Sequence, residues 1–182
     1  MVLNPGAYCM LLGRNLDTGM PVAYEDEHWG RVLQQLDLSD GQVRHILACA
    51  ELYLPALHTL HQEQRGLAQQ LLHPAVTQQP ADRSMLLPVL DASMPADVIV
   101  AALASNLKKQ HVLRGMLCGL VCGELSVLQR AKAAVCSRPL FLDVHAMVCV
   151  LAQDRMAAAL AAGRQPHMCF STDGSTVWIC SG

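Results

Sequence analysis

Apolar residues recur at steps of three and four along the chain between residues 43 and 71. Steps of this size keep side chains on one face of a helix, so the pattern predicts a long amphipathic helix over about residues 40–72. Ser39 and Gln42 have the spacing of a capping box, which marks the start of this helix. Gln64 is the one polar member of the predicted inward face, which consists of Val43, Ile46, Ala50, Tyr53, Leu57, Leu60, Gln64, Leu67 and Leu71.

Pro55 falls inside this predicted helix, where a proline removes one backbone hydrogen bond and can cost about 3 kcal/mol. Its place in the repeat points away from the apolar face, and a proline there bends a helix around a core. We therefore predict one kinked helix that continues past Pro55. Leu47 and Leu54 widen the apolar stripe, which favours a globular bundle over a thin coiled coil.

Shorter helices are predicted on both sides of the long one. The first covers about residues 25–36, around Trp29. After a stretch rich in proline and glutamine, a helix opens at Pro95, a capping box at Ser126 starts another, and Asp143 caps a last helix through Leu160. In the helix that opens at Pro95, we expect Lys108, Lys109 and His111 to point outward and the following residues to point inward: Ile99, Leu103, Leu107, Leu113, Leu117 and Leu120.

The fold class predicted from these patterns is all-α, a bundle of about five helices. Its parts are a loosely ordered leader (1–23), a helical sub-block (24–72), a linker (73–94), a second helical sub-block of the same domain (95–162) and a tail (163–182). In the tail, two apolar runs flank Asp173-Gly174, a strong signal for a small β-hairpin.

The composition narrows the classes of function. The chain of 182 residues is 52% apolar and 15% charged, which excludes a disordered polyelectrolyte. Its 13 basic residues are scattered, so we expect no direct binding of nucleic acid. The N-terminal residues do not have the pattern expected of a signal peptide, and the apolar runs fall short of the roughly 20 residues of a membrane span. We therefore expect no membrane contact, an intracellular location and reduced cysteines.

Three pairs of residues have a helical spacing that could present two ligands to one metal ion. They are His45 with Cys49, Cys118 with Cys122, and His145 with Cys149. Zinc accepts imidazole and thiolate, but two of these pairs would have to converge to complete a site. The alternative reading is that the cysteines fill the core and the histidines lie at helix edges. A metal or small-ligand sensor that uses these pairs is the competing hypothesis for the function.

Three glycines, Gly115, Gly119 and Gly123, are spaced four residues apart. Each costs a helix about 1 kcal/mol relative to alanine, so the repeat requires a reason. Either the glycines form a smooth face for close packing of another helix, or the helix ends near Gly119.

No motif for catalysis emerges from the sequence. The serines lack a GxSxG context, no glycine-rich phosphate loop is followed by Lys-Ser or Lys-Thr, and paired carboxylates are absent. We therefore expect a non-enzymatic protein without a cofactor.

Two segments of the sequence carry a family resemblance. The more specific one runs from Gln129-Arg130-Ala131-Lys132 to Pro139, Phe141 and Asp143; the other includes Trp29, Gln42, Gln64 and Arg65. Together they resemble the helical region after the basic leucine zipper of green-algal bZIP-type transcription-factor-like proteins. The resemblance implies a nuclear, transcription-linked role and supplies no catalytic residues. This sequence has no basic region or zipper ahead of the helical part, so DNA contact would belong to another segment.

These observations favour an interaction or regulatory module that binds another protein through a helical face. The candidate contact residues are Lys108, Lys109 and Arg114, which form the densest basic spot. The sequence does not define the oligomeric state.

Overall fold

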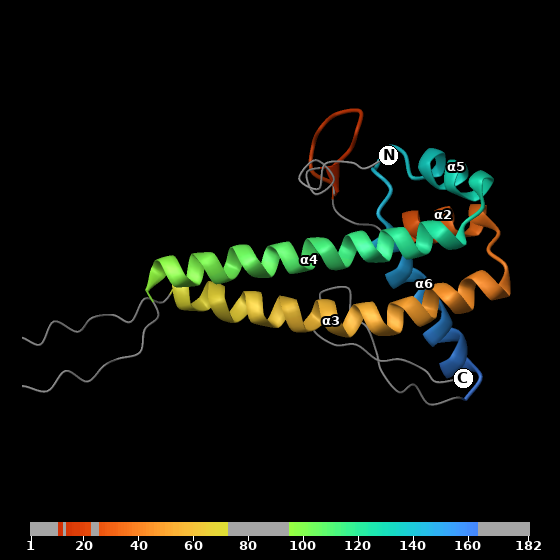
Figure 1. Cartoon of the computed structure of the whole chain (residues 1–182). Helices are drawn as coiled ribbons and strands as arrows, with labels where there is room; N and C mark the ends of the chain where they lie inside the picture. The colour runs from red at the N-terminus through yellow and green to blue at the C-terminus, as the bar shows by residue number, and fades with distance from the viewer. Residues whose placement is uncertain (1–10, 13, 23–25, 73–94, 164–182) are drawn as a thin grey trace, which may run out of the picture.

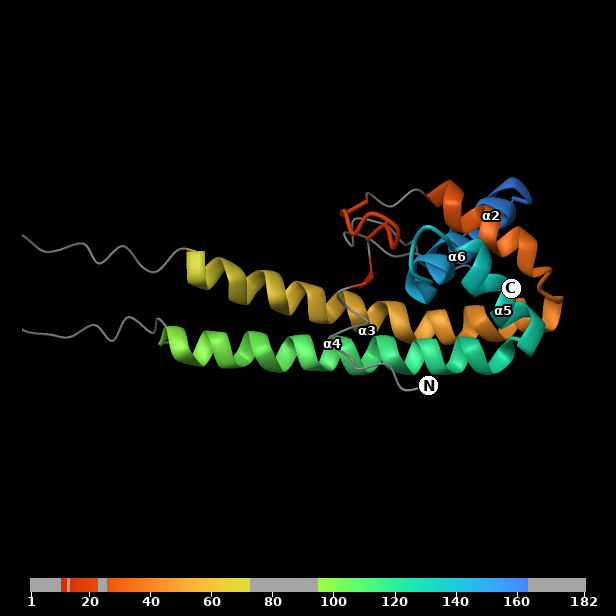
Figure 2. The same cartoon turned by 90° about the horizontal axis from the view of Figure 1, so that it is seen from above.

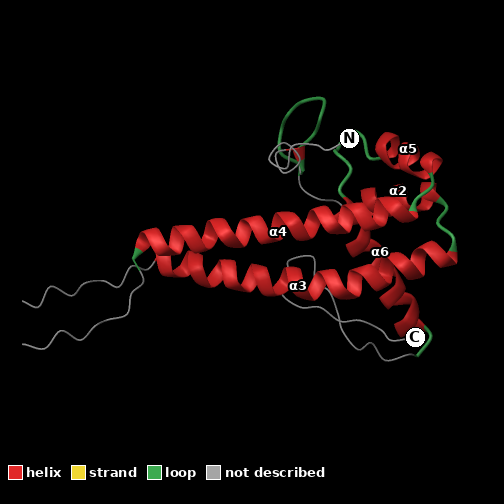
Figure 3. Cartoon of the chain, in the orientation of Figure 1, coloured by secondary structure: helices red, strands yellow, loops and turns green. Residues whose placement is uncertain are grey.

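The computed structural model describes residues 11–12, 14–22, 26–72 and 95–163. Within these residues the chain forms helices and loops without a strand, which confirms the predicted all-α class (Figure 3). The helices are α2 (Asp26–Leu36), α3 (Asp40–Leu72), α4 (Ala96–Glu124), α5 (Val127–Cys136) and α6 (Val144–Ala161). The predicted C-terminal hairpin lies outside the described residues.

The helices α3 and α4 form a long antiparallel pair, and the other three helices gather around one end of it (Figures 1 and 2). At that end, where α3 begins and α4 ends, α6 packs on both long helices and α2 packs on α5 and α6. The opposite end of the pair, toward Leu72 and Ala96, extends beyond this helical head as a two-helix arm.

The core consists of two apolar clusters that share α6. One cluster joins α3, α4 and α6 through residues such as Ile46, Leu117 and Val148. The other joins α2, α5 and α6 around the fully buried Trp29. By length and composition α6 could cross a membrane. Its apolar side chains enter both clusters of the core.

Two predicted capping boxes interlock where the long helices meet the head. Ser39 and Gln42 cap α3 reciprocally, and Ser126 and Gln129 do the same for α5. The two glutamines also bind each other, with Nε2 of Gln42 2.8 Å from Oε1 of Gln129. Gln129 further donates to the carbonyl oxygen of Leu36 at the end of α2. The boxes therefore fix the starts of two helices and tie three helices together.

The seam between α3 and α4 follows the predicted face on α3 and departs from it on α4. On α3, the predicted residues are buried up to Leu57 and half-buried beyond it. On α4, the prediction that Leu107 and Leu120 point inward is wrong, because their exposed fractions are 52% and 54%. The inward positions at steps of three and four are Ile99, Leu103, Asn106, Gln110, Leu113, Leu117 and Val121.

Polar partners explain why Asn106 and Gln110 occupy this seam. Nδ2 of Asn106 donates to the carbonyl oxygen of Leu60 at 3.0 Å and to the carboxylate of Glu63 at 2.9 Å. Nε2 of Gln110 donates to Oε1 of Gln64 and to Oδ1 of Asn106, both at 2.7 Å. A buried amide that is fully hydrogen-bonded can replace an apolar residue in a seam.

Both long helices continue through residues that could have interrupted them. Helix α3 continues through Pro55, as predicted. The helix α4 runs through Gly119 to Glu124, so the alternative that it ends near Gly119 is wrong. A Cβ atom at Gly115, Gly119 or Gly123 would meet nothing within 4 Å, so no described element packs closely on the glycine face.

Candidate protein-binding groove

A line of large apolar side chains lies exposed along one side of the α3–α4 pair. Leu52 of α3 is 81% exposed, and Val112 and Met116 of α4 are each 60% exposed. Apolar residues on several faces of α4 leave it without a clear amphipathic character, although the helix lies at the surface. An exposed row of this kind on a packed helix pair marks a candidate interaction surface.

These side chains border a continuous groove between the two helices. One hollow of about 670 Å³ lies toward the arm, and a second of about 290 Å³ lies toward the head. Leu113 and Met116 line both hollows, so the two are parts of one depression. We call it the α3–α4 groove; its α3 side is lined by Ala48, Cys49, Leu52, Tyr53, Ala56, Thr59 and Leu60, and its α4 side by Ser105, Lys108, Lys109, Val112, Leu113, Met116, Leu117 and Leu120.

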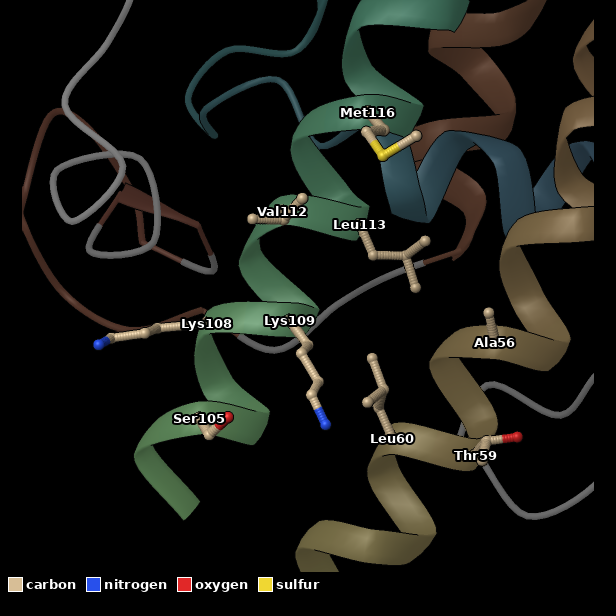
Figure 4. Close-up of a pocket in the computed structure, with 9 residues that line it drawn as sticks. All are labelled: Ala56, Thr59, Leu60, Ser105, Lys108, Lys109, Val112, Leu113 and Met116. Atoms are coloured by element: carbon tan, nitrogen blue, oxygen red, sulfur yellow. The ribbon is translucent and has the colours of Figure 1, made fainter. Parts of the chain in front are cut away.

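Two of the three predicted contact residues belong to this groove. Lys108 and Lys109 line the hollow toward the arm, and Figure 4 shows the Lys109 side chain directed toward Leu60 of α3 while Lys108 points away from α3. Figure 4 also shows Leu113 and Met116 on the α4 wall of this hollow. The lysines therefore form a basic edge beside an apolar floor.

Arg114, the third predicted contact residue, does not line the groove. It is half-buried near Tyr53 and His145, where its positive charge opposes the burial-driven rise in the pKa of Tyr53 and adds to the burial-driven fall in the pKa of His145. The structure thus separates Arg114 from Lys108 and Lys109, because three residues in sequence proximity occupy different faces of α4.

The three predicted metal-ligating pairs do not come together in the structure. Nδ1 of His45 lies 3.0 Å from the Glu124 carboxylate, and the sulfur atoms of Cys118 and Cys122 are 4.0 Å apart. Cys49 lines the groove on α3. Within the described ranges, no three histidine, cysteine, aspartate or glutamate side chains converge on a position that could hold a metal ion.

The third pair belongs to a buried polar cluster. The Tyr53 hydroxyl lies 3.2 Å from Nδ1 of His145, and the Cys149 sulfur lies 3.8 Å from the same nitrogen. Burial raises the pKa of Tyr53, lowers the pKa of His145 to about 4 and raises the pKa of Cys149 to about 12. All three groups are therefore neutral at pH 7, and the cluster stabilises the packing of α3 on α6 through a neutral hydrogen bond.

Sequence reasoning missed the groove because it placed two exposed residues of α4 on the inward face. With Leu107 and Leu120 placed inside, the remaining apolar residues of α4 did not stand out as a surface row. The signal that could have revealed it is the pair Val112 and Met116, spaced one turn apart and off the seam defined by Leu113 and Leu117.

Comparisons with protein-family models, curated proteins and solved structures found no match for this chain.

Proposed function

We propose that this chain is a non-enzymatic interaction module that binds another protein in the α3–α4 groove. The observation that carries the proposal is the row formed by Leu52, Val112 and Met116, which is exposed beside the hollows between α3 and α4. Burial of this apolar surface against a partner would lower the free energy by about 25 cal/mol per Å².

The groove also has the composition of a binding site. It is shallow, mostly apolar and bordered by a few polar groups, of which Lys108 and Lys109 are charged. Among the described residues, those that line it all come from α3 or α4, so a partner could enter without displacing α2, α5 or α6.

The resemblance to the region after the zipper of bZIP-type proteins suggests that the partner belongs to the transcription machinery and that the module acts in the nucleus. This part of the proposal depends on the sequence resemblance alone.

A photo-crosslinking amino acid placed at position 116 tests the proposal, with the same amino acid at position 127 as the matched control. Val127 is also an exposed apolar residue, but it lies on α5 away from the groove. We expect position 116 to form a covalent adduct with a protein that position 127 does not capture. The purified partner should then bind Met116→Asp at least tenfold more weakly than wild type, since a carboxylate buried in an apolar groove loses its hydration.

Binding by Val127→Asp should equal binding by the wild type. The proposal is wrong if both positions capture the same proteins, or if Met116→Asp binds the purified partner as tightly as wild type does.

A further inference from the structure

The α3–α4 groove carries charge of one sign. Among the described residues that line it, Lys108 and Lys109 are the basic ones and none is acidic. None of the five carboxylates of α3 and α4 lines the groove; they are Asp40, Glu51, Glu63, Asp97 and Glu124. A ligand with carboxylates along its edge would therefore meet complementary charge in the groove.

The walls of the groove favour a helical ligand over an extended one. Both walls are interior stretches of helix, whose backbone groups are bonded within the helix and offer no partners to a strand. An extended segment on this apolar surface would leave many of its own N–H and C=O groups without hydrogen bonds. A helix satisfies its own backbone and can pack side chains between the ridges of α3 and α4.

The length of the groove sets the length of the ligand. Its walls extend from Ala48 to Leu60 on α3 and from Ser105 to Leu120 on α4. At about 1.5 Å per residue these stretches measure roughly 18 and 22 Å. A ligand helix of about 12 to 15 residues, three to four turns, covers that distance.

We infer that the groove binds an acidic amphipathic helix of a partner protein. Apolar residues at steps of three and four on that helix contact Leu52, Val112 and Met116, and its carboxylates lie beside Lys108 and Lys109. A second copy of this chain fits less well, because a symmetric contact would bring the same lysine-bearing face against itself. The inference rests on the proposed function and specifies the chemistry of the partner.

Selection from a displayed library of 15-residue helical peptides tests this inference, with the full chain as the immobilised target. Wild type should enrich peptides that combine a 3–4 spaced apolar stripe with glutamate or aspartate beside it. The doubly substituted variant Lys108→Glu/Lys109→Glu should enrich peptides with lysine or arginine at the same flanking positions. Far-ultraviolet circular dichroism of each variant confirms that the helices are retained.

Binding of one enriched acidic peptide then gives the size of the effect. Fluorescence anisotropy should show about tenfold weaker binding to Lys108→Glu/Lys109→Glu, and weaker binding to wild type when the salt concentration is raised. Met116→Asp should abolish binding of this peptide. The same charge preference on wild type and the charge-reversed variant, or undiminished binding to Met116→Asp, would overturn the inference.

Two results separate this inference from the proposed function. If no peptide is enriched while the crosslinker at position 116 still captures a protein, the helical ligand is wrong and the interaction module stands. If the crosslinker instead joins position 116 to a second copy or to residues 73–94 of the same chain, the groove is occupied by this protein itself. That outcome would contradict both proposals.

Discussion

Tyr53 and His145 form a hydrogen bond in the core, where neither ring carries charge at pH 7. Burial is the main cause, because a charged imidazolium would lose its hydration there. Asp143 opposes this effect, whereas the positive charge of Arg114, and that of His61 when it is protonated, reinforce it. The sequence placed His145 in a metal pair; the structure gives it a hydroxyl partner on α3 that no helical spacing could indicate.

The lowered pKa of His145 predicts a loss of stability in mild acid. The pKa falls from 6.5 to about 4 on folding, so between these values the unfolded chain binds a proton that the folded chain does not. Neutral His145 therefore makes its full contribution to the free energy of unfolding above about pH 6.5. As the pH falls toward 4, this contribution decreases by at most about 3 kcal/mol. Chemical denaturation should show that the free energy of unfolding falls less between pH 7 and pH 5 for His145→Gln than for wild type. Equal losses would show that another group is responsible.

At the scale of elements, the prediction from the sequence differs most from the structure at the contact between α3 and α4. The apolar stripe on α3 could be predicted because eight of its nine positions are apolar and Gln64 alone is polar. The stripe on α4 could be predicted only in part, because Asn106 and Gln110 occupy successive seam positions and Leu107 lies beside them as an apolar alternative. Only the partners across the seam, Glu63 and Gln64, make those amides suitable for burial.

Substitutions at two adjacent positions distinguish the two faces of α4. Asn106→Ala should lower the free energy of unfolding by about 1–3 kcal/mol, because Asn106 is 0% exposed and its loss removes hydrogen-bond partners of Glu63 and Gln110. Leu107→Ala should change it by less than about 0.5 kcal/mol, as expected for a surface residue. Urea denaturation of both variants gives the comparison. A larger effect for Leu107→Ala would support the inward face first predicted from the sequence.

At the scale of the whole molecule, the boundaries of the helices were largely predictable and their assembly was not. The capping residues Ser39, Ser126 and Asp143 act locally, so the sequence indicates where α3, α5 and α6 begin. The bond between Gln42 and Gln129 joins residues far apart in the chain, and it has no local signature. The same holds for the groove, which lies along one side of the α3–α4 pair and takes no lining residue from the rest of the described chain.

Carbene footprinting of the full chain, free and with a selected acidic peptide, measures whether this side is open and whether the peptide covers it. The account predicts strong labelling of Leu52, Val112 and Met116 in the free chain, and protection of all three in the complex. Val127 and Val135, exposed on α5, should be labelled equally in both states. Weak labelling of the three groove residues in the free chain, or unchanged labelling after the peptide binds, would contradict the account.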